Sequence, residues 1–123
     1  MEITDTLYAF ARLADEGTIE QIGELLTADI EWAMAGTTWR GRAQVLDGLR
    51  SMRALGHAGP DSGNRHVVTN QEVRAESDRA TAHAYFLLVS RGAPAAILAV
   101  GSYRDELRRV TGRWLIARRE VAS

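Results

Sequence analysis

The segment RHVVTNQEVRAE, residues 65–76, begins a run of strand-forming sequence that fills the second half of the chain. Three similar segments follow it: TAHAYFLLVSRG (81–92), AAILAVGSYRDELRRV (95–110) and RWLIARREV (113–121). They are rich in β-branched and aromatic residues, and only the short connections ESDR, GAP and TGR separate them. Strands joined by such short connections predict an antiparallel meander.

The first half of the chain shows helical periodicity instead. In residues 3–15 the apolar residues Ile3, Leu7 and Ala11 recur at every fourth position, and Gly17 ends this predicted helix. A capping box that starts at Thr18 opens a second, short helix. IEWAM (30–34) alternates as a strand does, and a third amphipathic helix follows Gly41. Three helices are therefore expected before the meander.

A glycine-rich loop, ALGHAGPDSGN (54–64), joins the two halves. Helices first and antiparallel strands second predict an α+β fold, a cone-shaped barrel in which three N-terminal helices pack on a curved, mainly antiparallel sheet. A sheet that curls around helices leaves a pocket at its mouth, where ligands bind. The length predicts one domain over residues 1–123.

The composition narrows the function classes. Lys+Arg 15 against Asp+Glu 16 gives a net charge of -1, which predicts neither nucleic-acid nor membrane partners. Cysteine is absent, so thiolate chemistry and disulfides are excluded. We find no signal peptide and no apolar run of membrane-spanning length, and we expect a cytoplasmic protein. With three scattered histidines and no phosphate-binding or dinucleotide motif, we expect no metal and no cofactor.

Two residues suggest acid–base chemistry. The apolar stripe of the first helix continues to Asp15, a carboxylate at the end of a helix, where the macrodipole disfavours it. His66 shares a strand face with Val68 and Asn70, and a neighbouring carboxylate would fix its tautomer. Spacing alone does not bring Asp15 and His66 together. A solvated acid and a structural histidine are the alternatives.

Other candidates come from the strands and loops. Arg119 stands in an otherwise apolar row of the last strand, so it needs a ligand anion or carbonyl, or a structural carboxylate partner. Tyr103 lies in mid-strand, where its hydroxyl would reach a substrate oxygen or its ring would serve packing. Trp32 and Trp39 are interpreted as core or pocket walls. His57, in the glycine-rich loop, is expected to be solvated.

The order of these features resembles a known family. ADEGTIEQIGELLTADIEWAMAG (14–36), WRGR (39–42), RHVVTN (65–70) and GSYRDELRRVTGRWLIARREV (101–121) together resemble the SnoaL-like members of the nuclear transport factor 2-like superfamily. Within it the chain resembles scytalone dehydratase and hexachlorocyclohexane dehydrochlorinase. The similarity runs along nearly the whole chain.

The resemblance implies roles for individual residues. Asp15 in ADEGTIE and His66 in RHVVTN stand where those enzymes have an Asp–His pair whose histidine removes a substrate proton. Arg119 resembles a pocket arginine of the dehydrochlorinase, and Tyr103 stands where that enzyme has a pocket phenylalanine. We expect Arg119, with Tyr103 or Asn70, to stabilise the developing oxyanion or leaving group. The implied activity is a cofactor-independent lyase or isomerase, of dehydratase, isomerase or polyketide-cyclase type, on a small apolar or aromatic, polyketide-like substrate.

Departures from the two enzymes keep other functions open. Phe10 stands where the dehydrochlorinase has a lysine, and Ala14 and roughly Ser90 stand where scytalone dehydratase has a tyrosine and a second histidine. A non-catalytic ligand-binding module of the same fold is therefore the alternative. A purely structural partner is a third reading, because the alternating rows of the last two strands predict a homo-oligomer, a dimer or trimer.

Overall fold

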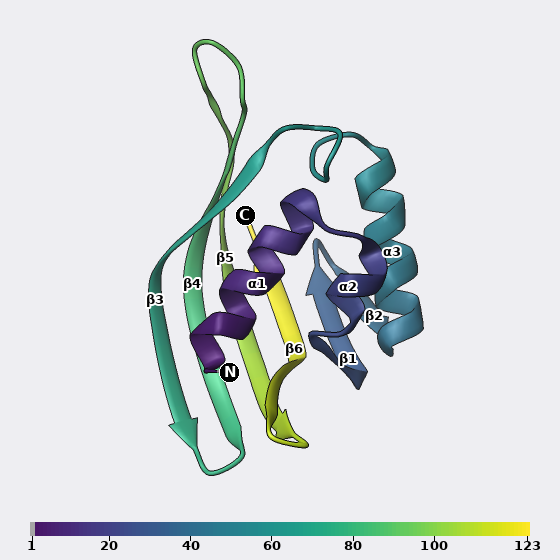
Figure 1. The fold of residues 1–123 in the computed structure, drawn as a ribbon, viewed down its shortest axis with the longest axis vertical. Coiled ribbons are helices and arrows are strands. Elements are labelled where there is room, and N and C mark those ends of the chain that lie inside the picture. Colours follow the sequence, from purple (N-terminus) through teal and green to yellow (C-terminus); the bar gives the residue numbers. More distant parts are fainter. Residues whose placement is uncertain (1) are drawn as a thin grey trace.

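The computed structural model describes residues 2–123. Helices come first, two strands and a helix follow, and four long strands complete the chain (Figure 1). The elements are α1 (Ile3–Glu16), α2 (Ile19–Gly23), β1 (Leu26–Met34), β2 (Thr37–Arg40), α3 (Arg42–Ala54), β3 (Arg65–Glu76), β4 (Arg79–Val89), β5 (Ile97–Val110) and β6 (Arg113–Ala122).

Local sequence explains where the helices begin and end. At Thr18 the predicted capping box is present: the hydroxyl accepts from the Gln21 backbone at 3.1 Å, and the Gln21 side chain accepts from the Thr18 backbone at 2.9 Å. The helix α3 starts after Gly41, whose φ of 85° favours glycine. The three predicted helices are confirmed.

The six strands form one sheet in the order β2-β1-β6-β5-β4-β3. The four C-terminal strands form the predicted antiparallel meander, and β1 joins it through a parallel pairing with β6. Two features were not expected: β1 is longer than the predicted 30–34, and β2 pairs antiparallel with it at residues 37–40. The strand β2 is short and mostly exposed, which explains why alternation did not reveal it.

The sheet curves around the helices and stays open (Figure 1). The helix α1 packs on β3 and β6, while α3 packs on β1 and β2 and contacts α2. Apolar side chains between these layers form the core, among them Leu7, Ile22, Leu26, Ile30, Val45, Leu107 and Ile116. No helix within residues 2–123 is long and apolar enough to cross a membrane. The predicted α+β cone is confirmed, and its helices leave a hollow beside the sheet.

Candidate active site

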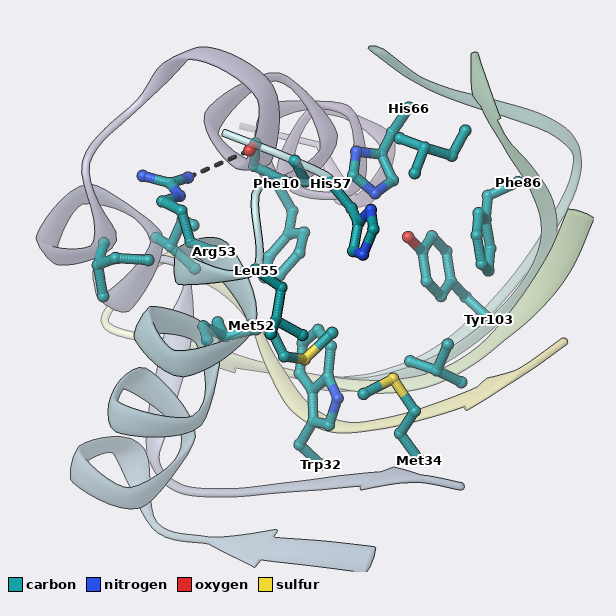
Figure 2. A pocket seen from close by; sticks show the side chains of 17 residues that line it. Phe10, Trp32, Met34, Met52, Arg53, Leu55, His57, His66, Phe86 and Tyr103 are labelled. Atoms are coloured by element: carbon teal, nitrogen blue, oxygen red, sulfur yellow. Dashed lines mark hydrogen bonds between the residues drawn. The ribbon is translucent and has the colours of Figure 1, made fainter. Parts of the chain in front are cut away.

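A cavity of about 240 Å³ lies between the helices and the concave face of the sheet (Figure 2). Its lining is mostly apolar, and its polar groups come from only a few residues. The lining residues are Phe10, Ala14, Ile19, Ile22, Trp32, Met34, Leu49, Met52, Arg53, Leu55, His57, Ala58, His66, Phe86, Leu88, Tyr103 and Val121. Such a chamber suits a small ligand with an apolar body and few polar groups.

Asp15 and His66 meet at one end of this cavity. Asp15 Oδ1 lies 2.7 Å from His66 Nδ1, and both carboxylate oxygens accept from the His66 backbone N–H at 3.0 Å. Asp15 is buried, and the His66 ring is half-buried. Because the carboxylate accepts only, Nδ1 carries the proton in the neutral ring and Nε2 is left as a free acceptor. The ring reaches into the cavity with that second nitrogen (Figure 2).

The end of α1, which carries Asp15, is fixed by an arginine of α3. Arg53 Nη1 donates to the Gly17 carbonyl at 2.7 Å, and Nη2 donates to the carbonyls of Leu13 and Ala14 at 3.2 and 3.1 Å. Figure 2 shows one of these bonds as a dashed line. A cation at these carbonyls is favoured by the helix dipole. Arg53 therefore holds the last turn of α1 in place, while His66 provides the partners that a carboxylate at this end of the helix needs.

Tyr103 extends from β5 into the cavity and is stacked from both sides. Its ring lies 4.6 Å from that of Phe86, at an interplanar angle of 15°, and the guanidinium carbon of Arg119 lies 3.9 Å from its centroid. Burial raises the pKa of the Tyr103 phenol from 10.0 to about 12, although the positive charge of Arg119 acts to lower it. The hydroxyl is therefore protonated at neutral pH, and it points toward His57 and His66 (Figure 2).

Arg119 does not line the cavity. Its Nε donates to Asp105 Oδ1 at 2.8 Å and its Nη2 to Oδ2 at 2.9 Å, which makes a bidentate pair inside the core. Burial lowers the pKa of Arg119, but the charge and hydrogen bonds of Asp105 raise it overall. Of the two partners that the sequence left open, the structure shows the carboxylate. We had expected Arg119 to face a substrate because the sequence did not show that Asp105 would be its partner. Asp105 shares the inward face of β5 with Tyr103.

Three predicted substrate-binding residues have different placements. Trp32 lines the cavity, whereas Trp39 lies behind it, stacked 6.4 Å from the Trp32 ring and packed on Gly48 of α3. Asn70 does not continue the face of His66. Its φ is 54°, and the pairing of β3 with β4 shifts between Thr69 and Glu72, so a bulge turns Asn70 outward to an exposed position.

His57 was expected to be solvated, and the structure places it at the cavity. It is exposed, yet its ring lies beside those of His66 and Tyr103 (Figure 2). Its carbonyl accepts from Asn64 Nδ2 at 2.8 Å, and the loop crosses over Arg53 at Gly59, where a Cβ would come within 2.9 Å of the Arg53 side chain. The loop leads directly into the strand of His66, and this adjacency in the sequence could have indicated that His57 lies near the cavity.

Comparisons with known proteins agree with this fold. A family model described as a SnoaL-like domain matches residues 1–120. An NTF2-like protein with a cystatin-like fold from Novosphingobium aromaticivorans is 30% identical, with a TM-score of 0.84 over 98% of this chain and 79% of that chain. A proposed scytalone dehydratase from the same organism is 21% identical, with a TM-score of 0.78 over 97% and 79%, and that likeness shows the fold alone. No curated protein matches the sequence.

Proposed function

Because the chain belongs to the SnoaL-like family of NTF2-like proteins, we propose that it is a cofactor-independent lyase or isomerase whose general base is His66. The observation that carries this proposal is the 2.7 Å contact between Asp15 Oδ1 and His66 Nδ1 at the end of an apolar cavity. A buried carboxylate on one ring nitrogen leaves the other free to accept a proton and stabilises the imidazolium that results. The substrate class that fits the lining is a small apolar or aromatic, polyketide-like molecule with an acidic C–H.

In the proposed reaction His66 Nε2 takes a proton from a carbon next to a carbonyl or similar group. The electron pair of that C–H bond moves toward the oxygen, and the Tyr103 hydroxyl donates to the negative charge that develops there. A positioned base contributes on the order of a hundredfold to ten-thousandfold in rate. A donor to the oxyanion contributes on the order of a hundredfold to a thousandfold.

The second step decides between an isomerase and a lyase. In an isomerisation the protonated His66 returns its proton to another carbon of the substrate. In a dehydration a hydroxyl leaves as the double bond forms, and it needs a proton to leave as water. His57, when protonated, would supply that proton from the mouth of the cavity, and its position beside His66 and Tyr103 supports this role. A cyclisation would use the same base to form a carbon nucleophile.

The proposed chemistry can be tested before the substrate is known. A set of small cyclic ketones in D₂O would be incubated with the protein, and deuterium uptake next to the carbonyl would be followed by mass spectrometry. We expect at least one ketone to exchange faster than in buffer or with heat-unfolded protein, because lyases, isomerases and cyclases of this type share the proton abstraction. If no ketone that binds the protein exchanges above the buffer rate, the lyase or isomerase proposal is wrong.

An absence of deuterium exchange would favour a non-catalytic ligand-binding module, and one observation supports this alternative. Asp105 engages Arg119 fully, so Arg119 is not available to a ligand in the cavity, as one of the two interpretations of the sequence had expected. A module of this kind would bind an apolar ligand in the same cavity and leave it unchanged. The two proposals therefore differ in deuterium exchange and agree in binding.

The homo-oligomer predicted from the sequence stays a prediction. Apolar side chains in register on the outer face of the sheet support it: Val67 of β3 is opposite Leu87 of β4, which is opposite Val100 of β5. Val67 and Val100 are exposed. A second copy that packed on this face would remove these side chains from water.

A further inference from the structure

The indole nitrogen of Trp32 is buried and finds no hydrogen-bond acceptor among residues 2–123. The side chain belongs to the lining of the cavity and is only 5% exposed. A buried Trp N–H usually finds a partner, because a donor without one gives up its hydrogen bonds to water and gains none. The chain itself therefore supplies no acceptor for this donor.

The surrounding packing fixes the direction of this N–H. The Trp32 ring lies 5.6 Å from the Phe10 ring and 6.4 Å from the Trp39 ring, and the guanidinium carbon of Arg119 lies 5.7 Å from its centroid. In the sheet, Trp32 pairs with Trp39 on one side and with Arg119 on the other. Held on these sides, the indole cannot turn to seek an acceptor in the core, so its orientation follows from the fold.

The edge that carries the nitrogen faces Met34, another residue of the cavity lining (Figure 2). A methionine side chain is unbranched and adapts to irregular space. Met34 is half-buried, and the Trp32 nitrogen behind it is fully covered. A shift of the flexible Met34 side chain would open the Trp32 N–H to the cavity.

We propose that Trp32 Nε1 is a second polar subsite of the cavity, which binds an acceptor oxygen of the ligand. Because the indole only donates, the group bound there is a carbonyl, ether or similar oxygen rather than an N–H. The polar groups of His57, His66 and Tyr103 lie at the other side of the cavity (Figure 2). The ligand that this arrangement fits is an apolar molecule with oxygen functions at both ends, and a hydroxylated bicyclic ketone serves as a probe of it. This inference rests on the proposed function only in assigning the cavity to a small apolar ligand, and it requires no turnover.

Two matched probes test this subsite: 6-hydroxy-1-tetralone, bound with its hydroxyl toward His57, His66 and Tyr103 and its carbonyl at Trp32, and the tetrahydronaphthol of the same hydroxyl position that lacks the carbonyl oxygen. The readout is the indole N–H region of a ¹H–¹⁵N NMR spectrum of the ¹⁵N-labelled protein, in which Trp32, Trp39 and Trp114 each give one signal. We expect the ketone to move the Trp32 signal downfield, as hydrogen bonding does, and to leave the other two nearly in place. We also expect the ketone to bind about tenfold more tightly than the phenol.

Variants assign the signals and check the selectivity. Trp114→Phe, which changes an indole that neither lines the cavity nor packs on Trp32, should keep the preference for the ketone, and Trp32→Phe should lose it. If Trp32→Phe does not fold, the spectrum of the wild-type protein still decides the question. Equal binding of both probes with an unmoved Trp32 signal overturns the subsite and leaves the proposed catalysis untouched. Failure of both probes to bind overturns this ligand class. The role of His66 is tested separately, by the deuterium-exchange experiment.

Discussion

Asp15 and Asp105 are both buried, each only 5% exposed, and each pairs with a basic side chain. The partner of Asp105 is Arg119, whose charge is permanent and whose guanidinium is enclosed by the rings of Phe10, Trp32 and Tyr103. The partner of Asp15 is His66, whose ring keeps a second nitrogen and borders the cavity. The comparison teaches that a buried carboxylate alone does not indicate chemistry. What suggests chemistry is a basic partner that keeps an atom without a hydrogen bond at the cavity.

The largest effect that we expect is on stability at the Asp105–Arg119 pair. Asp105→Ala leaves a guanidinium buried without its carboxylate, which should lower the free energy of unfolding by about 3–5 kcal/mol. Urea denaturation measures this loss. The matched control is Asp78→Ala, which removes a carboxylate that is 70% exposed from its pair with Arg109 and should cost less than about 1 kcal/mol.

The double variant Asp105→Leu/Arg119→Met sharpens the interpretation of this pair. If its role is to keep two buried charges compensated, apolar residues of similar size should restore most of the stability that Asp105→Ala loses. If the double variant is as unstable as the single one, the pair has a role beyond charge compensation, such as holding Tyr103 in its stack.

The contrast between the two pairs also separates what the sequence could predict from what it could not. The periodicity of residues 3–15 and the meander after residue 64 predicted the α+β cone, because apolar side chains must reach the core at the period of their element. The placement of Asp15 at the end of a helix and of His66 at the start of a strand carried the resemblance to the family. These features depend on local pattern and order along the chain.

The features that the sequence did not predict depend on long-range register. Arg119 pairs with Asp105 only because β5 and β6 align those residues, and no local pattern fixes that alignment. Asn70 turns outward because one bulge reverses the alternation of β3. His57 reaches the cavity because a loop folds back over Arg53, and the composition of a loop does not determine its path.

A smaller effect should appear only at high pH. Burial raises the pKa of Tyr103 to about 12, so its phenol stays protonated in the folded protein when that of the unfolded chain has already ionised. The stability that this shift contributes is present below pH 10 and is lost as the pH rises through about 12. The free energy of unfolding should therefore fall more steeply over this interval than in Tyr103→Phe. Parallel curves for the two proteins would show that the phenol is not shifted.

The most direct test of the account compares three variants in deuterium exchange, with the ketone that the wild-type protein exchanges fastest. His66→Ala removes the base, Asp15→Asn keeps the imidazole but loses the charge that orients it, and His83→Ala changes a histidine outside the cavity. The account predicts that the exchange rate falls by about a hundredfold or more in His66→Ala. In Asp15→Asn the rate should fall by the same factor or by less, and in His83→Ala it should not change, with all three proteins folded. A folded His66→Ala protein that exchanges the ketone as fast as the wild type would contradict it.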